Sequence, residues 1–422
     1  MAVLGVIADD FTGASDAASF LVKGGLSVRL VNGVPGEGYG AAAAGDAQAV
    51  VVALKSRTQE VRAAVADSLA AADFLLGAGA RQLYFKYCST FDSTPRGNIG
   101  PVADALMERS ASPFSILCPA LPVNGRVVRD GCLYVNGVLL QDSPMKDHPL
   151  TPMRDSDLTR LMAPQSRWES CRATPEEIGR LAARPPEEPC YLVPDYETAE
   201  DGERIAAAAA ELPLLTGGSG LLEPLARIWA RKLQTSIAAP RSATEGDAIL
   251  LAGSCSRATL GQIACYQARG LPSRKLDPAA VLEGRMTVEE LWPFVCECRE
   301  RGLAPLIYSS DTPDKVRAYQ ALGAERVSEA LEGFTAALAR RAVEEGFTRI
   351  ISAGGETSGA VTKALGFSSF LIGRSVAPGV PIMVPAERRD IRLVLKSGNF
   401  GQEDFFSHAL RMTAAEGKET EE

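Results

Sequence analysis

The sequence of 422 residues contains only two histidines, His148 and His408. A metal site built from several histidines is therefore excluded, and a Ser-His-Asp triad would have to use one of these two residues. His408 falls in an amphipathic stretch, where a structural role is expected. His148 stands beside Pro149 in an irregular segment, where it either binds a ligand or only covers the loop.

Two common nucleotide-binding patterns are also absent. No G-x-x-x-x-G-K-S/T pattern occurs, which excludes a standard P-loop. No G-x-G-x-x-G pattern follows a predicted strand, so an NAD-dependent sugar-acid dehydrogenase would lack its glycine fingerprint. Any phosphate-binding site must therefore use other glycine loops.

Membrane and nucleic-acid functions find little support. The sequence has no apolar run of about 18 residues and does not start with the basic-then-apolar pattern of a signal peptide. Its net charge is -8, and it carries no basic stripe. The nine cysteines form no C-x-x-C pair and mostly lie in apolar runs, as in reduced cytoplasmic proteins. We expect a cytoplasmic protein with small-molecule ligands, without a nucleic-acid or membrane partner, and leave formation of a homo-oligomer open.

Two adjacent carboxylates stand near the start of the chain. Asp9 and Asp10 follow an apolar run over residues 1–8, which predicts a buried strand, and Thr12-Gly13 then opens an Ala-rich helix. Open α/β sheets bind their ligands just beyond the carboxyl ends of strands. Asp10 or Thr12 could simply cap the helix. Because neighbouring carboxylates repel each other, we favour a functional role for Asp-Asp-x-Thr-Gly as a set.

Strand and helix patterns alternate along nearly the whole chain, which predicts an α/β fold with mostly parallel sheets. The dipeptides Asp-Gly and Asn-Gly predict a β-meander over residues 126–140, inserted in the first domain. The irregular segment 141–157 is long enough to indicate a functional loop. The strands predicted before the second domain are 2–8, 26–32, 48–54, 82–86, 114–118, 189–193 and 212–216, with helices at 58–76 and 97–110.

The length of 422 residues is too great for one core, so two domains are expected. Residues 235–247 lose the apolar periodicity, which indicates a linker. We place the first domain at residues 1–234 and the second at 248–412. Residues 413–422 are charged and rich in small side chains, as in a flexible tail.

Three loops in the second domain share one pattern, because each joins a predicted strand to a helix through glycine and hydroxyl residues. Backbone N–H groups at a helix N-terminus favour an anion, and glycine lets a phosphate approach the backbone without a Cβ clash. One such loop is weak support, but three would meet at one sheet edge, which favours a phosphate-rich ligand, most simply ATP. The loops are Gly253-Ser254-Cys255-Ser256, Gly354-Gly355-Glu356-Thr357-Ser358-Gly359 and Lys396-Ser397-Gly398-Asn399-Phe400-Gly401.

A polar segment over residues 84–98 of the first domain follows a predicted strand and enters a helix. Lys86 and Arg96 could hold a carboxylate, for which the arginine fork is well suited. Alternatively, the segment is a solvated loop in which Asp92 or Ser93 caps the helix, and the two roles can coexist.

Together these blocks resemble the four-carbon acid sugar kinase family over nearly the whole chain. The resemblance implies an N-terminal domain that binds a sugar acid, a C-terminal domain that binds ATP, and an active site in the cleft between them. The length and the segment 143–153 are most similar to the 3-oxo-tetronate 4-kinases, which implies ATP- and Mg²⁺-dependent phosphorylation of the terminal (C4) hydroxyl of 3-oxo-tetronate. The blocks are Ala8-Asp9-Asp10-Phe11-Thr12-Gly13, residues 86–98, Cys118-Pro-Ala-Leu-Pro-Val-Asn-Gly-Arg126 and the three C-terminal loops.

The same resemblance, together with the chemistry of phosphoryl transfer, assigns roles to single residues. Asp9 and Asp10 share the roles of general base and substrate orientation, without a decision as to which residue holds which. No Mg²⁺ ligand is assigned. The substrate-binding residues expected are Thr12, Gly13, Lys86, Ser89, Asp92, Arg96 and His148, and the ATP-binding residues expected are Ser254, Ser256, Gly354, Gly355, Glu356, Thr357 and Gly398.

Two alternatives stay open. The D-threonate and D-erythronate kinases of the family share most of these blocks, and single hydroxyl groups are distinguished by a few hydrogen bonds that a sequence does not reveal. The other alternative is a non-catalytic sugar-acid sensor on the same scaffold, although a sensor for an anion has little use for two adjacent carboxylates.

Overall fold

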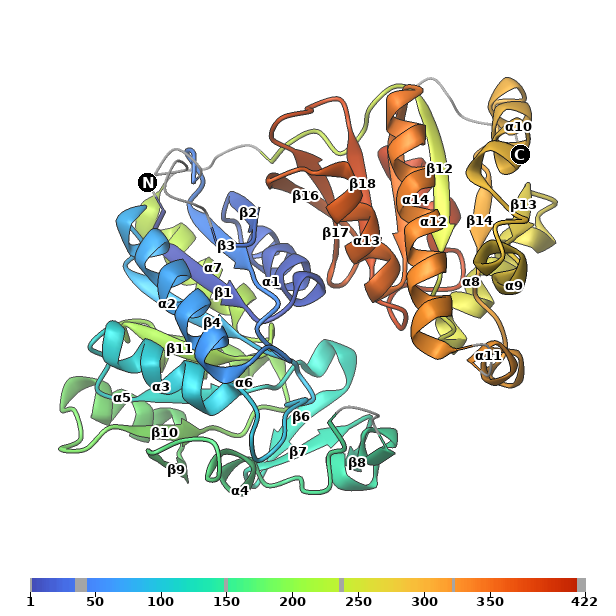
Figure 1. Ribbon diagram of the computed structural model, residues 1–422. Coiled ribbons are helices and arrows are strands. Elements are labelled where there is room, and N and C mark those ends of the chain that lie inside the picture. The colour runs from blue at the N-terminus through green and yellow to red at the C-terminus, as the bar shows by residue number, and fades with distance from the viewer. Residues whose placement is uncertain (1, 35–43, 148–150, 235–238, 321–322, 416–422) are drawn as a thin grey trace. The chain divides into compact units, whose positions relative to one another are not determined.

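The computed structural model describes residues 2–34, 44–147, 151–234, 239–320 and 323–415. The chain divides into two compact units, residues 1–238 (unit 1) and residues 239–422 (unit 2), each with its own sheet and helices (Figure 1). Along the described residues, no helix is both long enough and apolar enough to span a membrane.

Unit 1 is built on parallel strands in the order β2-β3-β1-β4-β11-β5-β10-β9. Helices cover both faces, since α1, α7 and α6 contact one another in series while α2 contacts α3. The predicted α/β architecture is confirmed. The strands are β1 (Leu4–Ala8), β2 (Val28–Asn32), β3 (Ala49–Ala53), β4 (Gln82–Lys86), β5 (Ser115–Cys118), β9 (Glu169–Arg172), β10 (Cys190–Val193) and β11 (Leu214–Gly217). The helices are α1 (Phe11–Lys23), α2 (Val61–Gly77), α3 (Ile99–Arg109), α4 (Leu158–Met162), α5 (Pro175–Ala183), α6 (Ala199–Ala209) and α7 (Leu222–Leu233).

The predicted meander is a separate antiparallel sheet of β6 (Arg126–Arg129), β7 (Cys132–Val135) and β8 (Val138–Leu139). Both turns have positive φ at their two central residues, 49° and 68° at Asp130-Gly131 and 52° and 81° at Asn136-Gly137. This is the backbone that tight hairpins require and that Asn, Asp and Gly tolerate best.

The segment after the meander is more regular than expected. It contains two short 3-10 helices, Leu140–Asp142 and Pro144–Asp147, where the sequence predicts an element-free loop. The N–H of Leu133 donates to the carbonyl of Ser156 at 2.8 Å, which ties the end of this segment to the meander. His148 lies outside the described residues.

The described strands of unit 2 lie in the order β13-β14-β12-β15-β18-β17-β16; the first five are parallel, and β17 pairs antiparallel with both β18 and β16. Helix α8 contacts α14, whereas α12 contacts α9, α11 and α13, so helices flank this sheet in two groups. The strands are β12 (Asp247–Ala252), β13 (Ser273–Lys275), β14 (Leu306–Tyr308), β15 (Phe347–Ala353), β16 (Ser369–Ala377), β17 (Val380–Pro385) and β18 (Arg392–Lys396). The helices are α8 (Arg257–Ala268), α9 (Pro278–Leu282), α10 (Val288–Glu300), α11 (Pro313–Gln320), α12 (Ala324–Glu344), α13 (Gly355–Leu365) and α14 (Phe405–Thr413).

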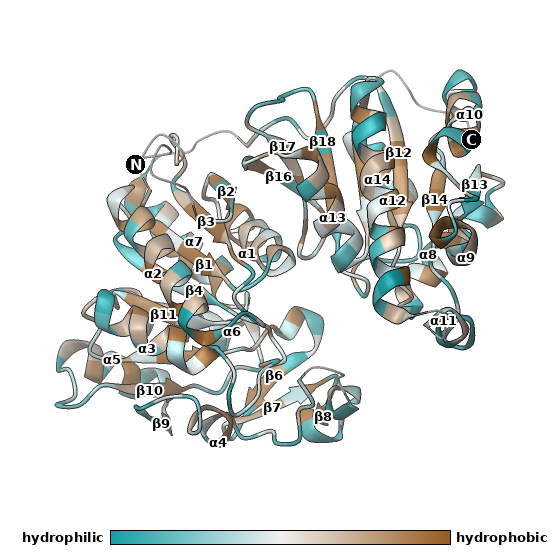
Figure 2. Ribbon diagram, in the orientation of Figure 1, coloured by the Kyte–Doolittle hydropathy of each residue, from teal (hydrophilic) through white to brown (hydrophobic). Residues whose placement is uncertain are grey.

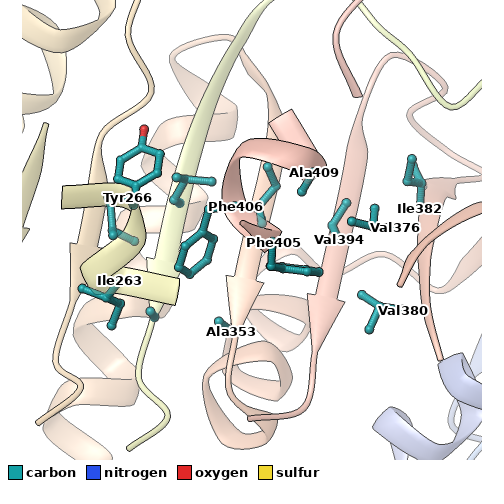
Figure 3. Close-up of a cluster of buried hydrophobic side chains, with 14 residues drawn as sticks. Ile263, Tyr266, Ala353, Val376, Val380, Ile382, Val394, Phe405, Phe406 and Ala409 are labelled. Atoms are coloured by element: carbon teal, nitrogen blue, oxygen red, sulfur yellow. The ribbon is translucent and has the colours of Figure 1, made fainter. Parts of the chain in front are cut away.

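A cluster of buried hydrophobic side chains fills the core of unit 2 between α8, α14 and the sheet (Figure 3). The rings of Tyr266 and Phe406 meet edge to face with centroids 6.2 Å apart, and Phe405 packs against Phe406. The strands β12 and β18 are mostly apolar along their length, while helices such as α12 carry hydrophilic stretches (Figure 2). This core fixes the carboxyl ends of β12, β15 and β18, where the three glycine loops begin.

The ends of unit 2 lie within the predicted linker and tail. Thr244 of the predicted linker donates its N–H to the carbonyl of Thr413 at 2.9 Å, and Ala415 donates its N–H to Thr244 at 3.2 Å. Residues 413–415 of the predicted tail therefore take part in unit 2, because their backbone groups find partners there. Residues 416–422 lie outside the described part of the chain.

Candidate active site

The carboxyl ends of three neighbouring strands bring charged residues of unit 1 together. Strand β1 pairs in parallel with β3 on one side and β4 on the other, with Ala8 opposite both Ala53 and Lys86. The segments that follow these strands therefore emerge side by side at one sheet edge. They carry Asp9 and Asp10 after β1, Arg57 after β3, and Asp92 after β4.

Arg57 binds three carboxylates at this edge. Its Nε and Nη2 donate to Asp9 Oδ2 and Oδ1 at 2.8 and 2.9 Å, a bidentate pair. Its Nη2 also lies 3.0 Å from Asp10 Oδ1, and its Nη1 lies 3.5 Å from Asp92 Oδ2. We call Asp9, Asp10, Arg57 and Asp92 the carboxylate cluster. A small pocket beside it is lined by Asp9, Ser56, Arg57, Phe85, Asp92, Ser93, Asn98 and Ile99.

The two adjacent aspartates have different surroundings. The side chain of Asp9 is 5% exposed and both its oxygens accept from Arg57, whereas the side chain of Asp10 is 33% exposed. Asp10 Oδ1 accepts from the N–H of Gly13 at 2.8 Å, so Asp10 does cap helix α1. Asp10 Oδ2 accepts no hydrogen bond from a described residue. Capping and a free carboxylate oxygen thus coexist in one side chain.

Burial and charge tune the ionisable groups of the cluster. Burial raises the pKa of Asp10 above its ordinary value; the positive charge of Arg57 opposes this rise, and the negative charge of Asp9 adds to it. Burial disfavours the charge of Arg57, but the carboxylates of Asp9 and Asp10 outweigh it and hold the pKa of Arg57 well above its usual range. The arginine therefore stays charged at any pH at which the protein is folded.

Lys86, the last residue of β4, lies next to the capping turn of α1. A Cβ added at Gly13 would lie 2.3 Å from Asp10 Oδ1 and 3.1 Å from Lys86 Nζ, so glycine is the residue that fits there. The ammonium of Lys86 is buried and donates to the carbonyl of Tyr87 at 2.7 Å. No carboxylate of the described chain lies within 4.0 Å of it. Donors of this ammonium thus remain for a ligand.

The other predicted substrate-binding residues are less tightly connected to the cluster. Asp92 belongs to it, and its carboxylate also accepts a hydrogen bond from the hydroxyl of Thr151. Thr12 and Ser89 are half-buried. Arg96 is exposed, and its backbone N–H donates to Thr94 Oγ1 at 3.3 Å.

Sequence reasoning missed Arg57 and understated Asn98. Arg57 falls four residues after β3, and a basic residue just beyond a predicted buried strand was the available signal. Asn98 Nδ2 donates to the carbonyls of Ser56 at 2.7 Å and Gln59 at 2.8 Å, and lies 3.5 Å from that of Arg57. Asn98 therefore holds the loop that carries the arginine.

The three glycine loops of unit 2 meet as predicted, because β12, β15 and β18 are adjacent parallel strands. The N–H of Gly253 donates to the carbonyl of Ala353 at 3.0 Å, and the N–H of Gly354 donates to that of Lys396 at 2.9 Å. Ser256 Oγ donates to the carbonyl of Gly398 at 2.6 Å and also accepts from the N–H of Thr259, which caps α8.

The glycines allow these loops to approach one another closely. Gly354 has φ of 132°, and a Cβ there would lie 3.0 Å from both Ser254 N and Thr357 Oγ1. A Cβ at Gly398 would lie 2.2 Å from Ser254 Oγ. Ser254, Gly354, Thr357 and Gly398 are thus gathered at the start of helix α13, which has no side-chain cap. Free N–H groups of such a first turn are suited to phosphate oxygens. Gly355 and Glu356, in the same turn, are exposed.

No group of three or more His, Cys, Asp and Glu side chains suited to a metal ion is found among the described residues. Each of the three carboxylates of the cluster instead forms an ion pair with Arg57. Protein side chains alone therefore do not form a complete cation cage in the described parts of either unit.

Comparison with known proteins also distinguishes two parts of the chain by the ligands that similar domains bind. The model of a sugar-binding N-terminal domain matches residues 4–225, and the model of a nucleotide-binding C-terminal domain matches residues 249–406. The chain belongs to the four-carbon acid sugar kinase family. The predicted resemblance is confirmed.

Two similar proteins of that family carry the name 3-oxo-tetronate kinase. A 3-oxo-tetronate kinase of Brucella melitensis is 44% identical over 98% of this chain and 96% of its own length. A 3-oxo-tetronate kinase of Actinobacillus succinogenes is 44% identical over 97% of this chain and 99% of its own. A crystal structure from Salmonella typhimurium LT2 is 40% identical, covers 97% of this chain and 99% of that one, and superposes with a TM-score of 0.86.

Proposed function

We propose that this protein is an ATP-dependent kinase that phosphorylates the terminal (C4) hydroxyl of 3-oxo-tetronate. Family membership and the shared name of its relatives support the reaction and the substrate class. The carboxylate cluster and Lys86 in the sugar-binding unit, and the three glycine loops in the nucleotide-binding unit, supply the chemical groups that such a reaction needs.

The observation that carries the proposal is the free oxygen of Asp10. The side chain of Asp10 is held on one side by the Gly13 N–H and Arg57, while Oδ2 faces no protein partner among the described residues. A carboxylate held in this way can accept the proton of the acceptor hydroxyl. Asp9 is engaged by Arg57 through both oxygens, so we assign it the role of holding the arginine. We therefore propose Asp10 as the general base.

In the proposed reaction, the γ-phosphoryl group of ATP is transferred to the C4 hydroxyl of the sugar acid. The C4 oxygen of the sugar acid forms a bond to the γ-phosphorus of ATP as Asp10 Oδ2 takes its proton. The bond from the γ-phosphorus to the bridging oxygen breaks, and ADP leaves with that electron pair. The raised pKa of Asp10 makes its carboxylate a stronger base than that of an ordinary aspartate.

Lys86 is the group we propose for the carboxylate of the sugar acid. Its buried ammonium has donors to spare beside Asp10 and Gly13, and burial strengthens its attraction to an anion. Arg96 could contribute only from an exposed position. Asp92 and Arg57 line the adjoining pocket, where hydroxyl or oxo groups could be hydrogen-bonded.

In the nucleotide-binding unit, we propose that the loops carrying Ser254, Ser256, Gly398 and the first turn of α13 receive the phosphates of ATP. Mg²⁺ would be bound through the phosphate oxygens and would offset part of their charge. Transfer requires the hydroxyl and the γ-phosphorus to be in contact.

A substrate panel tests the function. We expect ATP- and Mg²⁺-dependent formation of ADP with 3-oxo-tetronates, with kcat/KM at least about tenfold above that for threonate or erythronate, because one misplaced hydroxyl leaves buried polar groups unpaired. A preference for threonate would reassign the substrate within the family. Nucleotide and sugar-acid binding without turnover on any acid would favour a sensor instead.

A further inference from the structure

Lys396 is a buried cation directly beneath the glycine loops of unit 2. It is the last residue of β18, and only 1% of its surface is exposed. Its Nζ donates to Thr259 Oγ1 at 2.9 Å and to the carbonyls of Gly398 at 2.9 Å and Ser397 at 3.2 Å. All three N–H groups of the ammonium are thus directed to neutral oxygens.

These bonds connect the three loops. The carbonyl of Gly398 accepts from Lys396, from Ser256 Oγ and from Thr259 Oγ1, which joins the third loop to the start of α8. The backbone carbonyl of Lys396 accepts from the N–H of Gly354, which joins it to the start of α13. The side chain and backbone of one residue therefore contact every loop that we assign to the phosphates.

No carboxylate balances this charge within the described chain. Lys396 forms no ion pair within 4.0 Å, and its ammonium lies 5.6 Å from the ring centroid of Phe405. Burial without a counter-charge lowers the pKa of Lys396 to about 8. The charged or titratable side chains on its own strand and on the elements packed around it are Arg392 of β18, Arg257, Cys265 and Tyr266 of α8, Arg349 of β15, Glu356 and Lys363 of α13, His408 and Arg411 of α14, and Asp404 at the N-cap of α14.

Burying a charge without a counter-charge costs free energy, and a ligand of opposite charge that binds nearby offsets this cost. We propose that Lys396 is the charge-balancing and positioning residue of the nucleotide site, where it orders the three loops and where the phosphates of the bound nucleotide supply its missing counter-charge. Because its three donors are used by the protein, Lys396 acts on the phosphates through its field and through the loops. This inference rests on the proposed nucleotide-binding function.

The direction of the pH effect follows from the charge. In the free protein the ammonium loses its proton near pH 8, whereas a phosphate nearby stabilises the protonated form. Binding of nucleotide should therefore take up a proton between about pH 8 and pH 9.5, and affinity should fall as pH rises through that range.

Calorimetric titration of the full-length protein with ADP and with adenosine tests the proposal, in buffers of different ionisation enthalpy at pH 8.5. We expect wild type to take up a substantial fraction of a proton per ADP and none per adenosine. Lys396→Met should bind ADP at least about tenfold more weakly, with a smaller loss for adenosine and no proton uptake. Lys363→Met, which removes an exposed lysine on α13, should behave as wild type.

The outcomes separate the two proposals. Failure of the wild type to bind ADP would overturn the nucleotide site and the role of Lys396 together. ADP binding by wild type without proton uptake, or with equal affinity in a folded Lys396→Met variant, would overturn the role of Lys396 alone. A variant that loses ADP and adenosine equally would show that Lys396 only holds the loops together, against its proposed role in balancing phosphate charge.

Discussion

A single arginine gives two neighbouring aspartates different tasks. Successive side chains at the end of a strand point in different directions, so Asp9 turns inward to a bidentate pair with Arg57 while Asp10 remains one-third exposed at the start of α1. Repulsion between the two carboxylates is offset by the guanidinium, which also reaches Asp92. In the acidic motif, Asp9 therefore binds Arg57 through both carboxylate oxygens, whereas Asp10 uses only Oδ1 for Arg57 and the Gly13 N–H.

This difference predicts that substitution of Asp10 lowers the catalytic rate, whereas substitution of Asp9 lowers the stability of the fold. Asp10→Asn keeps the acceptor for the Gly13 N–H but cannot take a proton, so we expect normal folding and a kcat lower by about 10²-fold or more. Asp9→Asn weakens a buried charged pair, so we expect the free energy of unfolding to fall by about 1–3 kcal/mol. Steady-state kinetics and urea denaturation of both variants measure these effects. Full activity of Asp10→Asn would remove Asp10 from the role of base.

At the level of elements, the loop after β3 owes its position to the start of α3. Asn98 stands at the N-cap of that helix but makes no capping bond with its side chain, because its amide instead donates to the carbonyls of Ser56 and Gln59. A loop that carries a functional side chain needs such support to keep its geometry. Asn98, at the start of α3, thereby helps to hold the loop that carries Arg57.

Removing this support should affect the sugar-acid site only. In Asn98→Ala, buried carbonyls lose their donor, so we expect a loss of stability of about 1–3 kcal/mol and a lower kcat/KM for the sugar acid. The KM for ATP should stay unchanged, because the glycine loops lie in the other sheet. Gln59→Ala is the matched control, since it removes only the side-chain bond to Asp67 and leaves the Gln59 carbonyl in place. An equal effect of both variants would argue against Asn98 as the support of the loop.

Across the whole molecule, the two units place their polar loops by the same kind of strand arrangement. In each, adjacent parallel strands deliver polar loops to one sheet edge, with carboxylates and a lysine in unit 1 and glycine loops over a lysine in unit 2. The chemistry is thus divided between a unit suited to a small acid and a unit suited to phosphates.

Hydrogen exchange of the full-length Asp10→Asn variant should reveal this division without turnover. We expect a 3-oxo-tetronate to protect amides within residues 9–13, 56–59 and 86–98, and ADP to protect those within 253–259, 353–358 and 396–400, because bound ligands suppress local opening. Mass-spectrometric detection of peptides from each segment makes the comparison. Protection of the unit 1 segments by ADP alone would contradict the assignment.

The sequence alone determined the features that depend on neighbouring residues. Apolar runs predicted the strands before Asp9-Asp10 and before the glycine loops, and turn dipeptides predicted the meander, because periodicity and turn conformation are local properties. The convergence of the three loops could also be predicted, since all parallel strands of one sheet release the loops at their carboxyl ends on the same edge.

The tertiary structure decided what depends on residues distant in the chain. Arg57 meets Asp9 only because β3 lies beside β1, and Asn98 supports it only because α3 begins next to that loop. Lys396 is buried without a neighbouring carboxylate because the described parts of α8, α13 and α14 that pack around it place no acidic side chain near its ammonium. Which aspartate is free, and which lysine lacks a counter-charge, are set by strand pairing and side-chain direction, and neither is encoded in any single stretch of sequence.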